Sequence, residues 1–352
     1  MLVHIQILRF LAALAVVAFH ALGLAPKAFE VPESAVSLAL SYGGHGVDLF
    51  FVISGFIIFY TSRSAALTPA DFLRRRIERV VPLYFFVILA FTLLAIALPA
   101  VFGTPGWYTP RHILKSLAFV SFTDGEPPVV AVGWSLEYEM YFYLVVALLM
   151  ALTREPWRNV VTIFSALAIV GQLPGVSAAL GNYAFFTDAM ILEFVLGVIV
   201  GQLFVQGRIG LPFLIPTACA FAAVLASDPF NRAIMAGLPA ACLVAAAAFI
   251  SRARSNSSWA ERVLARLGDA SYSIYLAQVE TVSLAAVAIA NLIPAIAPML
   301  LLIVTSCIVV MLGLLVNTLV ERPLLELCRG VRRSRAPPRG VLSPPSPPPR
   351  GA

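Results

Sequence analysis

An arginine and a histidine near the amino terminus have the residue types and the spacing for proton transfer beside an anion-binding group. His20 follows Arg9 by eleven residues. On an α-helix this is three turns plus about 20°, so both side chains share one face, about 16 Å apart. Histidine can act as a general base near neutral pH, and arginine binds phosphate. We interpret the pair as a polar line through a helix bundle; the alternative is two side chains that snorkel to opposite interfaces.

Two carboxylates could orient a histidine in such chemistry. Asp48 follows the glycine-rich stretch GGHGV and could serve His20 or His45, or it could simply stabilise the start of a helix. Glu139 lies in the segment GWSLEYEMYFY, two residues after Glu137. Because two residues turn a helix by about 200°, we expect at most one of these two glutamates to point into the core.

Arginines in the segment FLRRRIERVVPLY could bind phosphate groups. Arg76 and Arg79 are three residues apart and share one helical face, and Arg74 and Arg75 precede them in a predicted cytoplasmic loop. The planar guanidinium matches the geometry of phosphate oxygens. The alternative is that these arginines only set the membrane orientation and contact anionic lipid headgroups.

The sequence contains no familiar metal or hydrolase signature. Its four histidines are spread over positions 4, 20, 45 and 112, and its four cysteines match no zinc or redox spacing. The motifs HExxH and GxSxG and the phosphate loop are absent. We therefore expect no metal, and we expect the cysteines to pack as apolar residues.

The composition places these polar residues in a membrane. Of the 352 residues 60% are hydrophobic and 12% are charged, whereas soluble domains carry about 25% charged residues. A spanning helix needs about 20 mostly apolar residues. We predict an all-α fold with ten such helices, at 5–24, 46–62, 81–101, 132–152, 159–176, 188–206, 211–226, 233–250, 271–290 and 296–320. The shorter apolar segment 112–123 is expected at the outer interface.

The distribution of Lys and Arg predicts that both termini are cytoplasmic. With ten spans, 19 of the 24 Lys and Arg residues fall in one set of connections and four in the other, with Arg9 inside the first span. Positive connections mark the cytoplasmic side. This placement argues against nucleic acid as a partner despite the net charge of +6. We expect a transmembrane domain at 1–325 and a basic, proline-rich, disordered cytoplasmic tail at 326–352.

Together, these clusters resemble the acyltransferase 3 family of membrane acyltransferases, particularly its exopolysaccharide-acetylating branch. The resemblance runs from Ile5 to Pro323 in the family's order. Its motifs here are Arg9 with His20, GVDLFFVISGF, RIER followed by Pro-x-Tyr, WSLEYEMYFY, LGDASYSIYLAQ and ERP. One position departs from the pattern: Gln278 stands where members commonly carry histidine. We interpret it as a structural hydrogen-bonding position, because glutamine cannot supply histidine's proton chemistry.

The resemblance implies O-acylation of a carbohydrate hydroxyl. The donor would be acyl-CoA, expected to be acetyl-CoA from the cytoplasm. The acceptor would be a cell-surface or exopolysaccharide sugar, or its lipid-linked precursor, at a bacterial-type cytoplasmic (inner) membrane. Combined with the residues above, it implies catalytic roles for His20, Asp48 and Glu139. The residues expected to bind the donor or substrate are Arg9, Arg75, Arg76, Arg79, Trp134, Ser135 and Tyr143. No tightly bound cofactor is expected.

A transporter is the main alternative. Ten spans with buried charges could export a polysaccharide precursor or an acyl donor, but transporters often show internal repeats and this sequence shows none. A structural assembly subunit would leave the arginine-rich segment unexplained. Binding of acetyl-CoA would separate the enzyme from both alternatives.

Overall fold

The described part of the chain is built from helices. The computed structural model describes residues 2–28, 43–64, 67–99, 107–209, 233–254, 256–293 and 298–335, and it contains no strand in these ranges. Within them, six helical segments are long and apolar enough to cross a membrane: Val3–Ala21, Pro69–Ala97, Ala131–Leu152, Val176–Val205, Met235–Ala253 and Met299–Cys328. The chain is therefore a multi-pass α-helical membrane protein.

Helices occupy the predicted spans wherever the structure describes them. They are α1 (Val3–Ala28), α3 (Gly46–Ser62), α4 (Pro69–Ala97), α7 (Trp134–Leu152), α8 (Pro156–Gly171), α10 (Ile191–Val205), α12 (Leu238–Ala253), α14 (Ser271–Leu292) and α15 (Pro298–Val316). The predicted span 211–226 lies outside the described residues. Because α3 and α8 are apolar but shorter than the six long segments, the number of crossings and the side of the termini stay predictions.

Two boundaries differ from those expected. The arginine-rich segment is not a loop but the first part of α4, which begins after the N-cap Thr68, whose side chain accepts a hydrogen bond from the backbone N–H of Asp71. The capping threonine and the proline at the first helical position start the helix before the apolar run. The predicted tail boundary at 326 falls inside α16 (Arg322–Arg335), and the rest of that tail lies outside the described residues.

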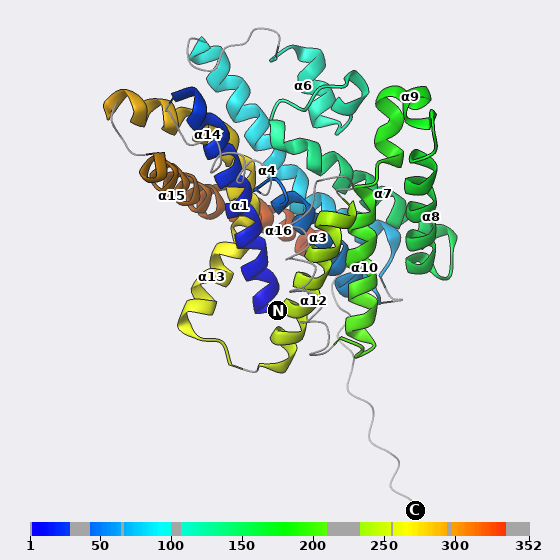
Figure 1. Ribbon diagram of the computed structural model, residues 1–352. Helices are drawn as coiled ribbons and strands as arrows, with labels where there is room; N and C mark the ends of the chain where they lie inside the picture. The colour runs from blue at the N-terminus through cyan, green and yellow to red at the C-terminus, as the bar shows by residue number, and fades with distance from the viewer. Residues whose placement is uncertain are drawn as a thin grey trace, which may run out of the picture.

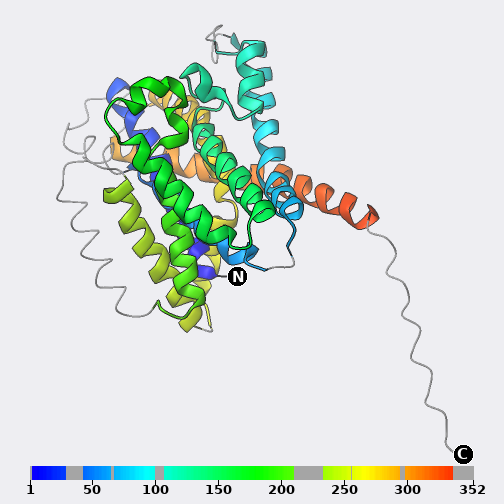
Figure 2. The ribbon, with the colours of Figure 1, turned by 90° about the vertical axis from the view of Figure 1, so that its right-hand side faces the viewer.

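The helices form a bundle in which α3 packs between α1 and α10 (Figure 1). On one side, α1 contacts α14, α15 and the short α13 (Trp259–Asp269); on the other, α10 contacts α12 and α8. Helix α6 (Pro110–Leu117) lies at the end of the bundle away from α13 and the amino terminus. Helix α16 extends away from the bundle (Figure 2).

Glycines bring the backbones of α3 and α10 into direct contact. A Cβ added at Gly55 would lie 2.1 Å from the carbonyl oxygen of Phe194, and one at Gly197 would lie 2.1 Å from that of Val52. Such close approach of small residues is a common way for membrane helices to associate, because lipid supplies no hydrophobic drive between them. It fixes the rotation of α3 and hence the direction of its side chains.

A second close contact sets α14 beside α1. A Cβ at Gly268, near the end of α13, would lie 1.9 Å from the carbonyl oxygen of Gln6. The start of α13 is fixed by a capping box in which Ser258 and Glu261 each bond to the other's backbone N–H. The corner between α13 and α14 therefore lies directly against α1, close to Arg9.

We predict that Gly55→Ala and Gly197→Ala each destabilise the bundle. Alanine favours a helix over glycine by about 1 kcal/mol, but the added methyl would meet backbone atoms that can move only if a helix shifts, which costs about 1–3 kcal/mol. The thermal unfolding midpoint of the purified protein in detergent should fall for both variants. Gly44→Ala is the matched control, because its methyl would meet only the Phe19 ring at 3.8 Å. Unchanged midpoints for the first two variants would contradict this packing.

Candidate active site

A cavity of about 210 Å³ lies where five helices meet. Its charged and polar lining comes from α1, α3, α4, α7 and α14, and consists of Arg9, Ser54, Arg76, Arg79, Ser135, Glu139, Tyr143, Tyr272 and Tyr275. We call it the inner cavity. Six of the ten residues that the sequence assigned to the site therefore converge on one space, although they come from distant parts of the chain.

Glu139 is the carboxylate of the inner cavity. Its Oε1 accepts one hydrogen bond from the Ser54 hydroxyl at 2.8 Å and another from the Tyr143 hydroxyl at 2.5 Å. Tyr143 lies one turn along α7, whereas Ser54 reaches across from α3. The carboxylate is thus oriented by two neutral donors and joins two helices, while the cavity places it near three arginines.

Arg9 and Arg76 have no carboxylate partner within the described residues. Arg9 donates a hydrogen bond to Gln6 Oε1 at 3.0 Å. Arg76 donates to the Thr61 hydroxyl at 2.7 Å, and its guanidinium lies over the rings of Phe72 and Tyr143. Both arginines are partly buried, and charged side chains within a membrane-spanning bundle are costly and often mark a functional site.

A second space, of about 510 Å³, opens beside the first. It is lined by residues from the end of α3, the start of α4 and the start of α16: Thr61, Ser62, Phe72, Arg75, Arg76, Glu78, Arg79 and Leu325. We call it the basic hollow. Arg76 and Arg79 line both spaces, so the two arginines lie at the junction between the basic hollow and the inner cavity. In the predicted orientation this junction faces the cytoplasm.

His20 lies on α1 beyond the inner cavity and is not among the residues that line it. Its Nδ1 is 2.9 Å from the carbonyl oxygen of Val16. Because a carbonyl oxygen only accepts hydrogen bonds, Nδ1 must carry the proton, and in the neutral ring Nε2 keeps its lone pair. The imidazole and the ring of Phe19 form a T-shaped pair with centroids 5.1 Å apart. The tautomer is therefore the one needed for a base acting through Nε2.

Asp48 contacts His45 and does not serve only to stabilise the start of α3. The carboxylate is fully buried, and its Oδ2 is 3.3 Å from Nδ1 of His45, three residues earlier. Of the two histidines that the sequence left open, this contact is with His45. Asp48 does not line the inner cavity.

Ser135 and Tyr275 close one wall of the inner cavity. Their hydroxyl oxygens are 2.7 Å apart, and both hydroxyls can donate to the carbonyl oxygen of Val132. Trp134, the neighbour of Ser135, does not line the cavity; its ring packs edge-on against Phe51 and Tyr138. Arg75 is exposed and lines only the basic hollow.

Glu137, in the first turn of α7, has a structural role. It is 3% exposed, and its carboxylate accepts hydrogen bonds from the backbone N–H groups of Ser121 (2.7 Å) and Phe122 (3.3 Å). Glu137 and Glu139 point in different directions, but the expectation that at most one would point into the core is wrong, because Glu137 is buried and Glu139 lines the inner cavity. Glu137 thereby ties the 109–125 segment, which contains α6 and the short helix η1 (Ser121–Asp124), to α7.

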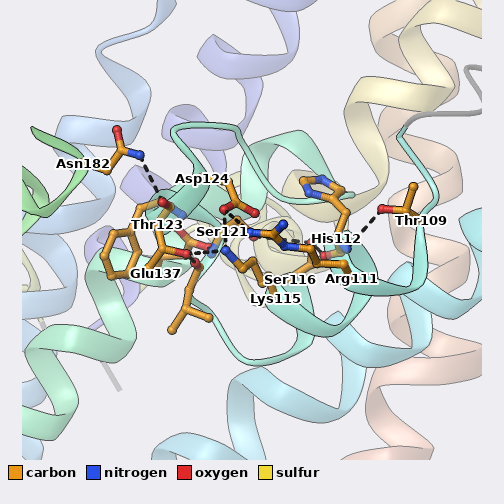
Figure 3. Close-up of polar contacts among 12 residues, drawn as sticks. Thr109, Arg111, His112, Lys115, Ser116, Ser121, Thr123, Asp124, Glu137 and Asn182 are labelled. Atoms are coloured by element: carbon orange, nitrogen blue, oxygen red, sulfur yellow. Dashed lines mark hydrogen bonds and ion pairs between the residues drawn. The ribbon is translucent and has the colours of Figure 1, made fainter.

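Polar contacts hold the 109–125 segment together (Figure 3). Lys115 and Arg111 both contact Asp124, and Asn182 donates to the carbonyl oxygen of Thr123. The hydrogen bond from the Lys115 ammonium, with the nearby charge of Arg111, holds the pKa of Asp124 below its ordinary value. Because this pKa is lower in the folded protein, the contact stabilises the fold above the ordinary pKa of Asp, and this stabilisation is lost as the pH falls through the lowered pKa of Asp124.

Gln278 does not make the structural hydrogen bond expected of it. The side chain is fully buried, yet neither its amide oxygen nor its nitrogen has a hydrogen-bond partner among the described residues. A buried amide without partners costs about 1–3 kcal/mol. The interpretation as a structural contact is therefore corrected for the part of the chain that the structure describes.

Several residues of the site were not singled out from the sequence. Ser54, Tyr272 and Tyr275 line the inner cavity, and Glu321 contacts Arg79. All four lie inside the motifs that carried the family resemblance. The signal was present, but their helices are apolar nearly all round, so the sequence did not indicate which polar side chain points inward.

Comparison with known proteins gives a consistent result. Residues 2–317 match the family model described as acyltransferase domain. The chain is 35% identical to the exopolysaccharide production protein ExoZ of Rhizobium meliloti over 305 residues, which cover 82% of this chain and 92% of the relative. It is 28% identical to the acyltransferase MdmB of Streptomyces mycarofaciens over 300 residues, 76% of each chain. No solved structure matches.

We predict that Glu137→Ala loosens the 109–125 segment and destabilises the protein by about 2–3 kcal/mol, because two backbone N–H groups lose a charged acceptor. Glu137→Gln should cost less, since its amide oxygen can keep one of the two bonds. The measurement is the thermal unfolding midpoint in detergent. Glu126→Ala, which removes an exposed glutamate from the neighbouring loop, should leave the midpoint unchanged. Equal midpoints for Glu137→Ala and wild type would show that Glu137 does not hold the 109–125 segment to α7.

Proposed function

The chain belongs to the acyltransferase family whose domain it matches, and from that premise we propose that it transfers an acyl group, acetyl in the first instance, from cytoplasmic acetyl-CoA to a sugar hydroxyl. That it is an O-acyltransferase follows from the family; the donor and the acceptor are our proposal. The observation that carries it is the junction of two spaces at Arg76 and Arg79, with a carboxylate and hydroxyls beyond them.

The donor would enter through the basic hollow. Coenzyme A carries several phosphates, and the hollow presents Arg75, Arg76 and Arg79 around a space larger than the inner cavity. Arginine forks bind phosphate oxygens in pairs of hydrogen bonds. With the phosphates held there, the narrow pantetheine arm would pass between Arg76 and Arg79 into the inner cavity. Arg9, which lacks a carboxylate partner in the described chain, would add positive charge along this path.

The acceptor would approach from the opposite end of α1. His20 lies eleven residues beyond Arg9, about 16 Å further along the helix axis. Its Nε2 keeps a lone pair because Nδ1 donates to Val16. This arrangement suits a base that meets the acceptor hydroxyl on one side while the thioester reaches it from the other.

The proposed step moves one proton and one acyl group. Nε2 of His20 takes the proton of the sugar hydroxyl as its oxygen attacks the thioester carbonyl. The C–S bond then breaks, the new ester forms, and the imidazolium returns the proton to the leaving thiolate. Glu139 would keep Ser54 and Tyr143 in place around the arm, since both hydroxyls donate to it. Asp48 would orient His45, which it contacts, rather than His20.

The acceptor class follows from a relative. ExoZ is named for exopolysaccharide production, and this chain aligns with 92% of its length. We therefore propose that the acceptor is a cell-surface or exopolysaccharide sugar or its lipid-linked precursor, reached at the cytoplasmic (inner) membrane of a bacterial-type cell.

We predict that His20→Asn lowers acetyl transfer by about 100-fold or more, the usual effect of losing a general base. Arg76→Ala should mainly raise the KM for acetyl-CoA, because it removes a phosphate contact. The measurement is transfer from acetyl-labelled CoA to a crude lipid-linked glycan extract, using purified protein in lipid.

The matched control is His4→Asn, which changes another histidine of α1 that contacts Ser251 and Glu261 instead. It should retain transfer. Full activity of a folded His20→Asn protein would contradict the assignment of the base. A folded wild-type protein that neither binds nor consumes acetyl-CoA would contradict the donor and favour another acyl carrier.

A further inference from the structure

Glu321 is a buried carboxylate with three partners from three elements. It is 2% exposed and lies in the π-helix η6 (Asn317–Glu321) that joins α15 to α16. Its Oε1 is paired with Arg79 of α4, and its Oε2 accepts from the Ser273 hydroxyl of α14 at 2.5 Å and from the Asn317 amide at 2.7 Å. A buried carboxylate with both oxygens engaged is well fixed in position.

Arg79, in contrast, is only partly buried by this contact. Its side chain remains 33% exposed, and the residue lines both the inner cavity and the basic hollow. Its guanidinium also lies over the ring of Tyr272, 5.6 Å from the centroid. One edge of the guanidinium is therefore held by the protein, while the rest of the residue borders the two spaces.

The π-helix supports a functional interpretation of this contact. Wide turns of this kind are rare and are frequently found at functional sites. Asn317 and Glu321 are the first and last residues of this turn, they are hydrogen-bonded, and both are buried. A long arginine side chain carries about 2 kcal/mol of rotamer entropy, so a fixed partner matters where one orientation is needed.

We propose that Glu321 is a positioning residue for the donor: it does not touch acyl-CoA but holds Arg79 at the junction in the orientation that binds the donor's phosphates. This inference rests on the proposed function, because it requires the donor to pass this junction. Ser273 and Asn317 act one step further out, by holding the carboxylate that holds Arg79.

A competing electrostatic effect has the opposite sign. Glu321 also neutralises Arg79, so its removal makes the junction more positive, which would tighten binding of an anionic donor. Positioning predicts weaker binding when the charge of Glu321 is removed, whereas simple neutralisation predicts tighter binding, most clearly at low salt. The two roles can therefore be separated by the direction of the change in Kd.

The test is acetyl-CoA binding and acetyl transfer by the full chain in lipid nanodiscs. Glu321→Gln should raise the Kd and the KM for acetyl-CoA about tenfold, as expected for losing one well-placed charged contact, with a smaller change in kcat. In the double variant Arg79→Gln/Glu321→Gln, the loss should equal that of Arg79→Gln alone, because Glu321 acts only through Arg79. Glu326→Gln, an exposed glutamate on α16, is the matched control and should bind as wild type.

Ser273→Ala covers the case in which Glu321→Gln does not fold, since it removes one hydrogen bond to the carboxylate and leaves the ion pair. It should raise the Kd about two- to threefold. Unchanged or tighter binding in either folded variant, or additive losses in the double variant, would overturn the inference while leaving the proposed donor intact. A wild-type protein that binds no acetyl-CoA would overturn both.

Discussion

The main constraint on this bundle is that charged side chains lie among apolar helices, and the packing of the helices must satisfy them. Each charge taken out of water must be paired, hydrogen-bonded or offered to a ligand. Glu139 is satisfied by two hydroxyls, Glu321 by an arginine and two neutral donors, and Glu137 by backbone N–H groups. Arg9 and Arg76 are left without carboxylates in the described chain, and they border the two spaces into which an anion would fit.

The apolar packing serves this polar arrangement. Glycines let α3 lie against α10, and this fixes the direction in which Ser54 meets Glu139. Gly268 lets the start of α14 lie against α1, which brings Tyr272 and Tyr275 to the same cavity as Arg9. Small residues therefore act where helices cross, while the bulky apolar residues face lipid or fill the remaining core.

The sequence predicted the helices better than it predicted the site. Apolar runs located the helices because lipid requires satisfied backbones and long apolar segments, and the family recognised from ordered motifs is confirmed by the domain match. The start of α4 was missed, although Thr68 as the N-cap and Pro69 at the first helical position are typical signals of a helix start. The pairing of Arg79 with Glu321, 242 residues apart, leaves no mark in local spacing. The i,i+3 spacing allowed the contact between Asp48 and His45 but could not exclude His20, and no spacing could show that Gln278 is buried without hydrogen-bond partners among the described residues.

The placement of Glu137 and Glu139 on one helix links the 109–125 segment mechanically to the inner cavity. Glu137 accepts hydrogen bonds from the 109–125 segment, and Glu139 accepts one from Ser54. The two glutamates are two positions apart, which is only about 3 Å along the helix axis. A rigid helix moves as a unit. A displacement of the 109–125 segment that moved α7 would therefore also shift the Glu139 carboxylate in the inner cavity. By thermodynamic reciprocity, a ligand that moved one of these two groups would change the affinity for a ligand at the other by the same factor.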